Sequence, residues 1–233
     1  MTSVPSASTA IVVLTHKIDR SISRFINELK SACGTEYNFY VLGDNTKGTL
    51  DTYHQDPDWF LFKKDQLSAL SYPNKLGNLF QRDGKKTAHH SHFNFPPGFT
   101  DIPLLFFFKN KPGYDYYWLV EYDVRYSGSW RQFFSELNQS DADLLCTTLT
   151  RIEDLPDWFH WSTLSLNVPK ESYLRGFCPI YRMSQKGLGV LHDRYLEGAA
   201  GHYEGVIPSL FRHQGLKIED IGGEGDFVPE DRR

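Results

Sequence analysis

The stretch AIVVLTHKIDRSISRFINELKSACGTEYNFYVL, residues 10–42, contains two short apolar runs on either side of a segment with helical spacing. The runs are Ala10–Leu14 and Tyr37–Leu42, and each has the length and composition of a buried strand. Between them, apolar residues recur at helical intervals, at Ile18, Ile22, Phe25, Ile26 and Leu29. Two parallel strands joined by a right-handed helical crossover are the simplest structure for this pattern.

The alternation of strand and helix resumes after a central region with a weaker pattern. Residues 46–100 contain several turn signals, and we expect short helices and functional loops there. Further strands are predicted at Tyr116–Val124, Ala142–Thr148, Phe177–Tyr181 and Lys217–Ile221. Helices are predicted to begin at a cap at Asp101, at Ser127 or Ser129, and at Ser184, with a last one over Tyr203–His213. The sequence therefore predicts a single Rossmann-like α/β domain with a mostly parallel central sheet flanked by helices.

The composition is that of a globular chain without a strong charge excess. Of the 233 residues, 40% are hydrophobic, and 29 acidic residues against 25 basic ones give a net charge of -4. No run of lysine or arginine exceeds two residues, which argues against a nucleic-acid partner. Three cysteines, Cys33, Cys146 and Cys178, lie far apart, which is typical of reduced, buried thiols in a cytoplasmic protein.

The N-terminal residues carry no sign of a membrane segment. The apolar run Ala10–Leu14 spans five residues, far fewer than the ~20 that a transmembrane helix needs. No basic leader precedes it. We therefore expect a cytoplasmic protein, for which peripheral attachment to a membrane stays open.

Two carboxylates end the apolar run YYWLVEYDV at residues 116–124. Residues two apart in a strand point to the same side, so Glu121 and Asp123 would present their oxygens together. Ligands of open α/β sheets bind beyond the carboxyl ends of the strands, and Mg²⁺ or Mn²⁺ prefers carboxylates together with substrate phosphates. The pair thus indicates a metal-bound diphosphate. In the other interpretation Glu121 pairs with Arg125 or another basic residue, and Asp123 starts a polar turn.

An apolar strand that runs into Glu121-Tyr122-Asp123, followed by a helix and by ADLL at 142–145, resembles the middle of the GT-A class of nucleotide-sugar glycosyltransferases. In that class a DxD motif holds the divalent metal and the donor diphosphate. The resemblance implies that Glu121 and Asp123 form a variant of this motif and bind Mn²⁺ or Mg²⁺. Because glutamate replaces the first aspartate, Asp123 is the safer metal ligand.

A second part of the chain resembles the acceptor-binding half of GT-A enzymes. It comprises the segments FCPIYRMS at 177–184, GHYE at 201–204 and GLKI at 215–218. Inverting members carry the general base at the start of the last helix, where this sequence has Glu204. In the alternative interpretation Glu204 complements the helix dipole, a contribution of about 0.3–1 kcal/mol.

Further candidate binding residues lie outside the two motifs. The resemblance implies that Asp44 occupies the place where GT-A enzymes often contact the nucleoside, although an Asx turn explains it equally well. Trp158, Trp161 and His202 are candidates for the acceptor sugar, since aromatic faces suit the apolar side of a sugar ring. The alternatives are core or lid packing for the two tryptophans and a surface position for His202.

Several basic side chains complete the set of candidates. Arg151 is assigned to the donor diphosphate, with Lys170 and Arg175 as further candidates, although each can equally be a solvated base. The cluster HHSH at 89–92 carries three imidazoles, but no cysteine or carboxylate joins it locally. We therefore favour a structural or acceptor-loop role for that cluster over zinc binding.

The resemblance covers residues 10–221. It implies a nucleotide-sugar-binding half at 10–125 and an acceptor-binding half at 126–221, between a flexible N-terminus at 1–9 and a C-terminal tail at 222–233. The implied function is the metal-dependent, inverting transfer of a sugar from a nucleotide-diphosphate donor to a hydroxyl of a saccharide or glycoconjugate acceptor, in polysaccharide or glycoconjugate synthesis.

Two other classes of protein fit part of the sequence. A nucleotidyltransferase shares the α/β core and the metal carboxylates, but the segment LTHK at 14–17 lacks the glycine-rich phosphate loop that such enzymes usually carry. A non-catalytic carbohydrate-binding module would keep the aromatic residues and dispense with the metal. Metal-dependent nucleotide binding separates this module from a transferase.

Overall fold

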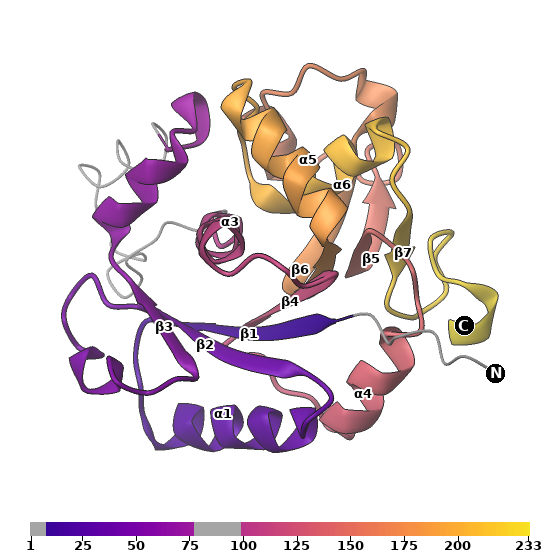
Figure 1. Cartoon of the computed structure of the whole chain (residues 1–233). Coiled ribbons are helices and arrows are strands. Elements are labelled where there is room, and N and C mark those ends of the chain that lie inside the picture. Colours follow the sequence, from indigo (N-terminus) through magenta and orange to yellow (C-terminus); the bar gives the residue numbers. More distant parts are fainter. Residues whose placement is uncertain (1–7, 77–98) are drawn as a thin grey trace.

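A computed structural model describes residues 8–76 and 99–233, and within them the chain forms one seven-stranded sheet (Figure 1). Its spatial order is β3-β2-β1-β4-β6-β5-β7. The strands are β1 (Thr9–Thr15), β2 (Asn38–Asp44), β3 (Trp59–Phe62), β4 (Tyr116–Glu121), β5 (Leu144–Arg151), β6 (Leu174–Ser184) and β7 (Ile218–Asp220). The prediction of an α/β fold with a mostly parallel central sheet is confirmed.

The sheet contains one strand of opposite direction. All neighbouring pairs are parallel except β4 with β6 and β5 with β6, which are antiparallel. β6 therefore lies between two strands that run parallel to each other. It joins the part of the sheet made by the first half of the chain to the part made by the second.

The first strand, helix and strand adopt the predicted crossover. Helix α1 (Arg20–Cys33) begins after Asp19, whose side chain accepts a hydrogen bond of 2.9 Å from the backbone N–H of Ile22. β1 and β2 are parallel neighbours, with Ala10 opposite Asn38. The sequence pattern predicted this unit correctly because the strand, the helix cap and the amphipathic helix follow one another directly in the chain.

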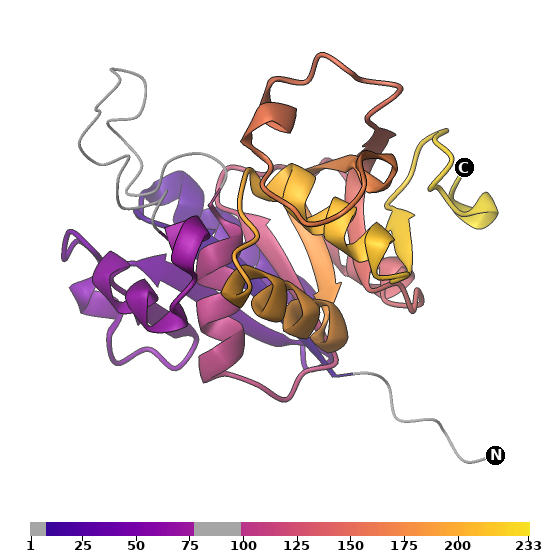
Figure 2. The same ribbon diagram turned by 90° about the horizontal axis from the view of Figure 1, so that it is seen from above.

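Helices cover both faces of the sheet (Figures 1 and 2). Besides α1, they are α3 (Asp101–Asn110), α4 (Trp130–Leu137), α5 (Gln185–Leu196) and α6 (Tyr203–His213). α1 and α4 pack on one face, and α3, α5 and α6 pack on the other. Short 3-10 helices complete the fold: η1 (Asp51–Tyr53), η2 (Lys64–Leu70), η5 (Phe159–Thr163), η6 (Lys170–Ser172) and η7 (Glu230–Arg232).

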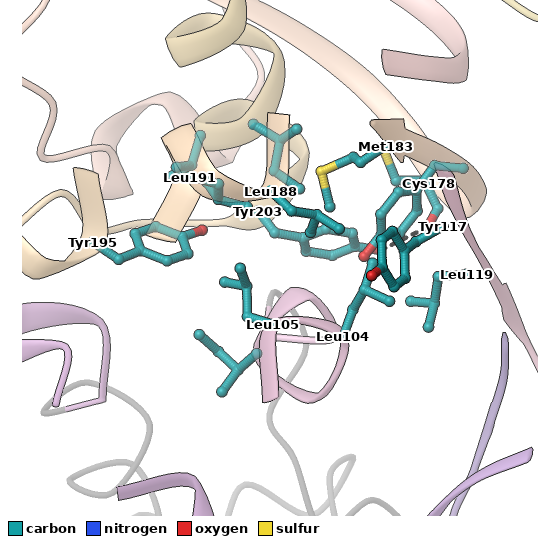
Figure 3. Close-up of a cluster of buried hydrophobic side chains, with 14 of the residues drawn as sticks. Leu104, Leu105, Tyr117, Leu119, Cys178, Met183, Leu188, Leu191, Tyr195 and Tyr203 are labelled. Atoms are coloured by element: carbon teal, nitrogen blue, oxygen red, sulfur yellow. Dashed lines mark hydrogen bonds between the residues drawn. The ribbon is translucent and has the colours of Figure 1, made fainter. Parts of the chain in front are cut away.

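The alternation of side chains along β4 divides the core into two layers. Trp118 and Val120 face α1 and α4, whereas Tyr117 and Leu119 face α3, α5 and α6. Figure 3 shows the second layer, in which Leu104 and Leu105 of α3 approach the leucines of α5. Side chains at the carboxyl end of β4 with the parity of Leu119 therefore point towards α3 and α6.

Several details of the sequence-based prediction are wrong, among them the bounds of β6, which extends over Leu174–Ser184 rather than Phe177–Tyr181. The strand over Tyr116–Val124 ends at Glu121, and the following residues form a turn closed by the Val124 N–H bonding to the Glu121 carbonyl at 3.1 Å. The segment Trp59–Phe62 is a strand rather than part of the expected loops and short helices. Asp101 lies inside the first turn of α3, after the cap residue Thr100, and is buried.

Other predictions hold. Ser129 and Ser184 each accept a hydrogen bond from the N–H three residues on, and so cap α4 and α5. The three cysteines are free and buried. The histidine cluster at 89–92 lies outside the described residues. In the described part of the chain no helix is both long and apolar enough to cross a membrane.

Candidate active site

The carboxyl ends of β1, β2 and β4 meet at one edge of the sheet. The chain proceeds from β1 to β2 on one side of β1 and later returns to β4 on its other side, so this edge is the switch point of the sheet. Leu14 lies opposite Glu121, and Thr15 lies opposite Gly43. Side chains at the ends of all three strands therefore project into one region, the usual ligand site of open α/β sheets.

Glu121 is the buried member of the predicted carboxylate pair. Burial raises the pKa of its carboxyl group to about 7, and the nearby negative charges of Asp123 and Glu204 contribute to the shift. The Tyr203 hydroxyl lies 3.4 Å from Glu121 Oε1 and 3.2 Å from the Cys178 carbonyl oxygen, to which it can donate. Asp123 is exposed in the turn after β4. The two carboxylates are close, but they lie in different environments.

The raised pKa of Glu121 predicts a pH-dependent stability. Below the unfolded pKa of 4.5 the carboxyl group is protonated in both states. Between 4.5 and about 7 the unfolded chain is ionised while the folded protein keeps the proton, so stability falls as pH rises through this range and levels off above it. In chelator, we expect Glu121→Gln to unfold with a free energy roughly 2 kcal/mol above wild type near pH 8.5. Urea titrations should show this difference vanish near pH 4. Equal free energies at both pH values would contradict the burial of a charge at this position.

His16, which follows β1, also belongs to the site. It is not among the site residues predicted from the sequence. Its imidazole lies near the charges of Asp44 and Asp123 and packs edge-on against Tyr122, with ring centroids 5.1 Å apart. Burial lowers its pKa and Lys17 lowers it further, while the two aspartates oppose these effects. The signal available in the sequence was its position immediately after the first strand, where switch-point ligands bind.

Asp44 makes the Asx turn and keeps one carboxylate oxygen available. It is 2% exposed, and its Oδ1 accepts a hydrogen bond of 3.0 Å from the Thr46 N–H. Its Oδ2 is buried and has no hydrogen-bond partner in the described structure. A buried carboxylate oxygen that receives no hydrogen bond costs free energy. The Asx turn therefore explains the contact of Oδ1 but not the burial of Oδ2.

Glu204 lies in the first turn of α6 and is directed towards β6. Its Oε1 accepts a hydrogen bond of 3.0 Å from the Cys178 N–H, and its Oε2 is 3.9 Å from His202 Nδ1. Burial raises the pKa of this carboxyl group, while the hydrogen bond from Cys178 and the charge of Arg175 oppose the rise. Its side chain is only 12% exposed. A glutamate that only interacts with the helix dipole can do so from an exposed position, so the dipole alone does not explain this burial.

Two segments hold the turn that leads into α6. The Lys75 ammonium donates to the Gly201 carbonyl at 2.8 Å, and the His202 N–H donates to Thr163 Oγ1 at 3.1 Å. Gly201 has φ of +129°, and a Cβ there would lie 2.8 Å from the Thr163 carbonyl oxygen. Lys75 is itself fixed by a fully buried ion pair with Asp101 at 3.1 Å. The position of Glu204 therefore depends on residues remote in sequence.

Tyr203 anchors the same turn in the core. Figure 3 shows its ring between leucines of α5 and α3, with Cys178 beyond its hydroxyl end. The hydroxyl contacts β6 through the Cys178 carbonyl and β4 through Glu121. Tyr203 thus links the two carboxylates of the site. The local sequence pattern did not predict this role.

The aromatic loop lies beside Glu204. The Trp158 ring packs against the first turn of α6, since a Cβ on Gly205 would lie 3.0 Å from it. Its centroid is 5.8 Å from that of His202, which in turn stacks on His160 at 3.9 Å. Trp161 has a packing position, with its indole N–H donating to the Leu155 carbonyl at 2.8 Å. Trp158 and His202 are near the site, while Trp161 supports the loop.

Two of the predicted basic residues lie elsewhere. Arg151 forms an ion pair with Asp226 and stacks on the Phe227 ring at 5.0 Å. Lys170 is exposed in η6. The structure therefore brings together Asp44, Glu121, Asp123, Glu204, Trp158 and His202, and leaves Arg151 engaged by the C-terminal segment.

A divalent metal fits the carboxylates at the end of β4. In residues 8–76 and 99–233 no three histidine, cysteine or acidic side chains form a complete ligand group. Mg²⁺ and Mn²⁺ need no such group, because one or two carboxylates and substrate phosphates suffice. The exposed carboxylate of Asp123 and the adjacent Glu121 supply that set.

Fold and site together define an α/β protein with a candidate carboxylate site at the switch point of its sheet. The chain belongs to the family described as Protein of unknown function (DUF3405), whose sequence profile matches residues 19–143. That range contains Asp44, Glu121 and Asp123 and ends before Glu204.

No curated protein matches this chain. Among solved structures, the chain is similar to the apo form of mouse xyloside xylosyltransferase 1, with 11% sequence identity and a TM-score of 0.36 over 90% of this chain and 81% of that chain. A similarity of this size carries no conclusion about the fold or the activity of this protein.

Proposed function

We propose that this protein is a metal-dependent, inverting glycosyltransferase that moves a sugar from a nucleotide-diphosphate donor to a hydroxyl of a saccharide or glycoconjugate acceptor. The observation that carries the proposal is the convergence of two carboxylates from separate motifs. Glu121 at the end of β4 and Glu204 at the start of α6 both lie next to Tyr203 and Cys178. The resemblance of both motifs to GT-A enzymes supports the same assignment.

Glu204 is the general base in this proposal. An acceptor hydroxyl has a very high pKa, so it must lose its proton as its oxygen attacks the anomeric carbon and the bond to the nucleoside diphosphate breaks. Burial raises the pKa of Glu204 and makes it a stronger base than an exposed glutamate. The hydrogen bond from the Cys178 N–H occupies Oε1, which leaves Oε2 to take the proton.

The donor side is formed by the ends of β2 and β4. Asp123 and Glu121 would hold Mn²⁺ or Mg²⁺, which when bound supplies positive charge to the departing diphosphate. Asp44 Oδ2, buried and without a donor, suits a hydroxyl or N–H of the nucleoside. On the acceptor side, Trp158 and His202 offer ring faces beside Glu204.

Nucleotide binding tests the proposal directly. We expect the melting temperature to rise with one of UDP, GDP, CDP or CMP in the presence of Mn²⁺, and the shift to vanish in chelator and in Asp123→Ala. A ligand at a hundred times its Kd adds about 2.7 kcal/mol to stability, which is roughly 5–10 °C for a chain of this size.

The matched control for this experiment is Glu28→Ala, on the exposed side of α1, which should keep the full shift. If no nucleotide changes the melting temperature of the wild type with or without metal, the protein is not a nucleotide-sugar transferase and the carbohydrate-binding module becomes the better description. A shift that survives in Asp123→Ala would remove Asp123 from the donor site.

A further inference from the structure

Arg175, which the sequence offers as a candidate for the donor diphosphate, lies beside Glu204 and Trp158 and is not used in the proposed mechanism. It is near the start of β6, opposite Thr150 of β5. Its guanidinium carbon is 5.5 Å from the centroid of the Trp158 ring. Since Trp158 packs on Gly205 in the first turn of α6, Arg175 and Trp158 form one wall next to Glu204.

No carboxylate of the described residues forms a direct ion pair with Arg175, although its charge acts on Glu204. The guanidinium forms no ion pair or hydrogen bond there, and its Nε is buried without a partner. The charge of Arg175 lowers the pKa of Glu204, but the two carboxylate oxygens of Glu204 face the Cys178 N–H and His202. A partly buried cation without a counterion is costly, so the site favours an anion supplied from outside.

Arg175 is on the acceptor side of the general base. The charges that act on Glu121 are those of Asp123 and Glu204, and His16 is influenced by Asp44 and Asp123. Arg175, by contrast, acts on Glu204. An anion at Arg175 would therefore lie beside Trp158 and Glu204, on the proposed acceptor side of the site.

Two exposed aromatic side chains flank the wall. Phe159, next to Trp158 in the chain, is 78% exposed, and Phe177 is 47% exposed. Phe177 lies two residues after Arg175 on β6, so both side chains project to the same side of the strand. Exposed rings pack against the apolar faces of sugars, and a guanidinium pairs with a carboxylate or phosphate through two parallel hydrogen bonds.

We propose that Arg175 binds an anionic group of the acceptor, so that the acceptor is an acidic saccharide whose carboxylate or phosphate pairs with the guanidinium beside Trp158. The assignment of this saccharide as the acceptor rests on the proposed transferase function. The anion site itself rests on Arg175, Trp158 and the exposed phenylalanines, and can be tested without turnover.

The test is an NMR titration of the ¹⁵N-labelled protein with three small probes. They are methyl β-D-glucuronide, glucose 6-phosphate and the neutral methyl β-D-glucoside, and the signal is the indole N–H of Trp158, assigned with Trp158→Phe. We expect at least one acidic probe to bind about tenfold or more tightly than the glucoside, a factor that one charged hydrogen-bonded pair can supply. The tighter acidic probe identifies carboxylate or phosphate.

Substitutions then assign the preference to Arg175. In Arg175→Gln the acidic probe should bind no better than the glucoside, and Arg175→Lys should recover part of the preference because it keeps the charge but not the planar fork. Arg24→Gln, an exposed arginine on α1, is the control and should keep the preference. Equal affinities for the three probes in wild type, or an unchanged preference in Arg175→Gln, overturns the proposal.

The nucleotide experiment separates this inference from the proposed function. Arg175→Gln should keep the metal-dependent nucleotide shift, and Asp123→Ala should keep the preference for the acidic probe. Binding of nucleotide without any acidic preference would reject the anion site and retain the transferase. An acidic preference without nucleotide binding would retain the anion site and reject the transferase.

Discussion

Glu204→Gln is expected to lower turnover roughly 10²–10⁴-fold, the usual contribution of a positioned general base. The substitution keeps the shape of the side chain, and the amide oxygen can still accept the hydrogen bond from the Cys178 N–H. Folding and nucleotide binding should therefore stay close to wild type, and the loss should fall on kcat. Once the donor has been identified by thermal shift, release of nucleoside diphosphate in the presence of acceptor measures the effect.

The pH profile gives a second readout for Glu204. The base must be ionised to accept a proton, and burial raises the pKa of this carboxyl group above that of an ordinary glutamate. At saturating metal and donor, which would keep Glu121 ionised, activity of the wild type should fall as pH decreases through that raised pKa, and this acid limb should be absent in Glu204→Gln. Glu224→Gln, an exposed position in the C-terminal segment, serves as control. Turnover within about tenfold of wild type would exclude Glu204 as the base.

Lys75→Met should cost about 3–5 kcal/mol of unfolding free energy, as removal of one partner from a buried ion pair typically does. The substitution leaves Asp101, fully buried, without its cation. It also removes the donor to the Gly201 carbonyl, three residues before Glu204. Urea unfolding followed by tryptophan fluorescence measures the change.

A double variant tests the cause of this loss. Lys75→Met combined with Asp101→Asn removes the uncompensated charge and should recover part of the lost stability, while the Tyr195 hydroxyl can still donate to the amide oxygen. Lys186→Met, an exposed lysine at the start of α5, is the control and should change stability little. A loss below about 1 kcal/mol in Lys75→Met would mean that water reaches the pair.

The elements predicted correctly from the sequence have a pattern contained in one contiguous segment. The elements that were missed depend on tertiary contacts. α1, α4 and α5 have a side-chain cap and an apolar face in one contiguous segment. β3 was missed because four residues next to an Asp-Pro-Asp turn look the same in a strand and in a loop. β6 was predicted to end before Arg182 because a charged residue is unusual in a buried strand; here its guanidinium donates to the backbone carbonyls of Ser140 and Ala142.

The candidate site divides in the same way. Glu121, Asp123 and Glu204 are visible in short motifs. His16 and Tyr203 are not, because their relevance depends on which strand ends meet in the fold. Nor can sequence reasoning find the partner of Arg151, an aspartate of the C-terminal segment far away in the chain.

The direction of β6 has a consequence for how the chain folds during synthesis. The first half of the chain supplies β3, β2, β1 and β4, and β4 then has an open hydrogen-bonding edge until β6 is made. Because the intervening strand β5 pairs with β6 rather than with β4, it cannot close that edge. A nascent chain therefore carries an unpaired strand edge on β4 until residues 174–184 have left the ribosome, and exposed strand edges are sites of aggregation.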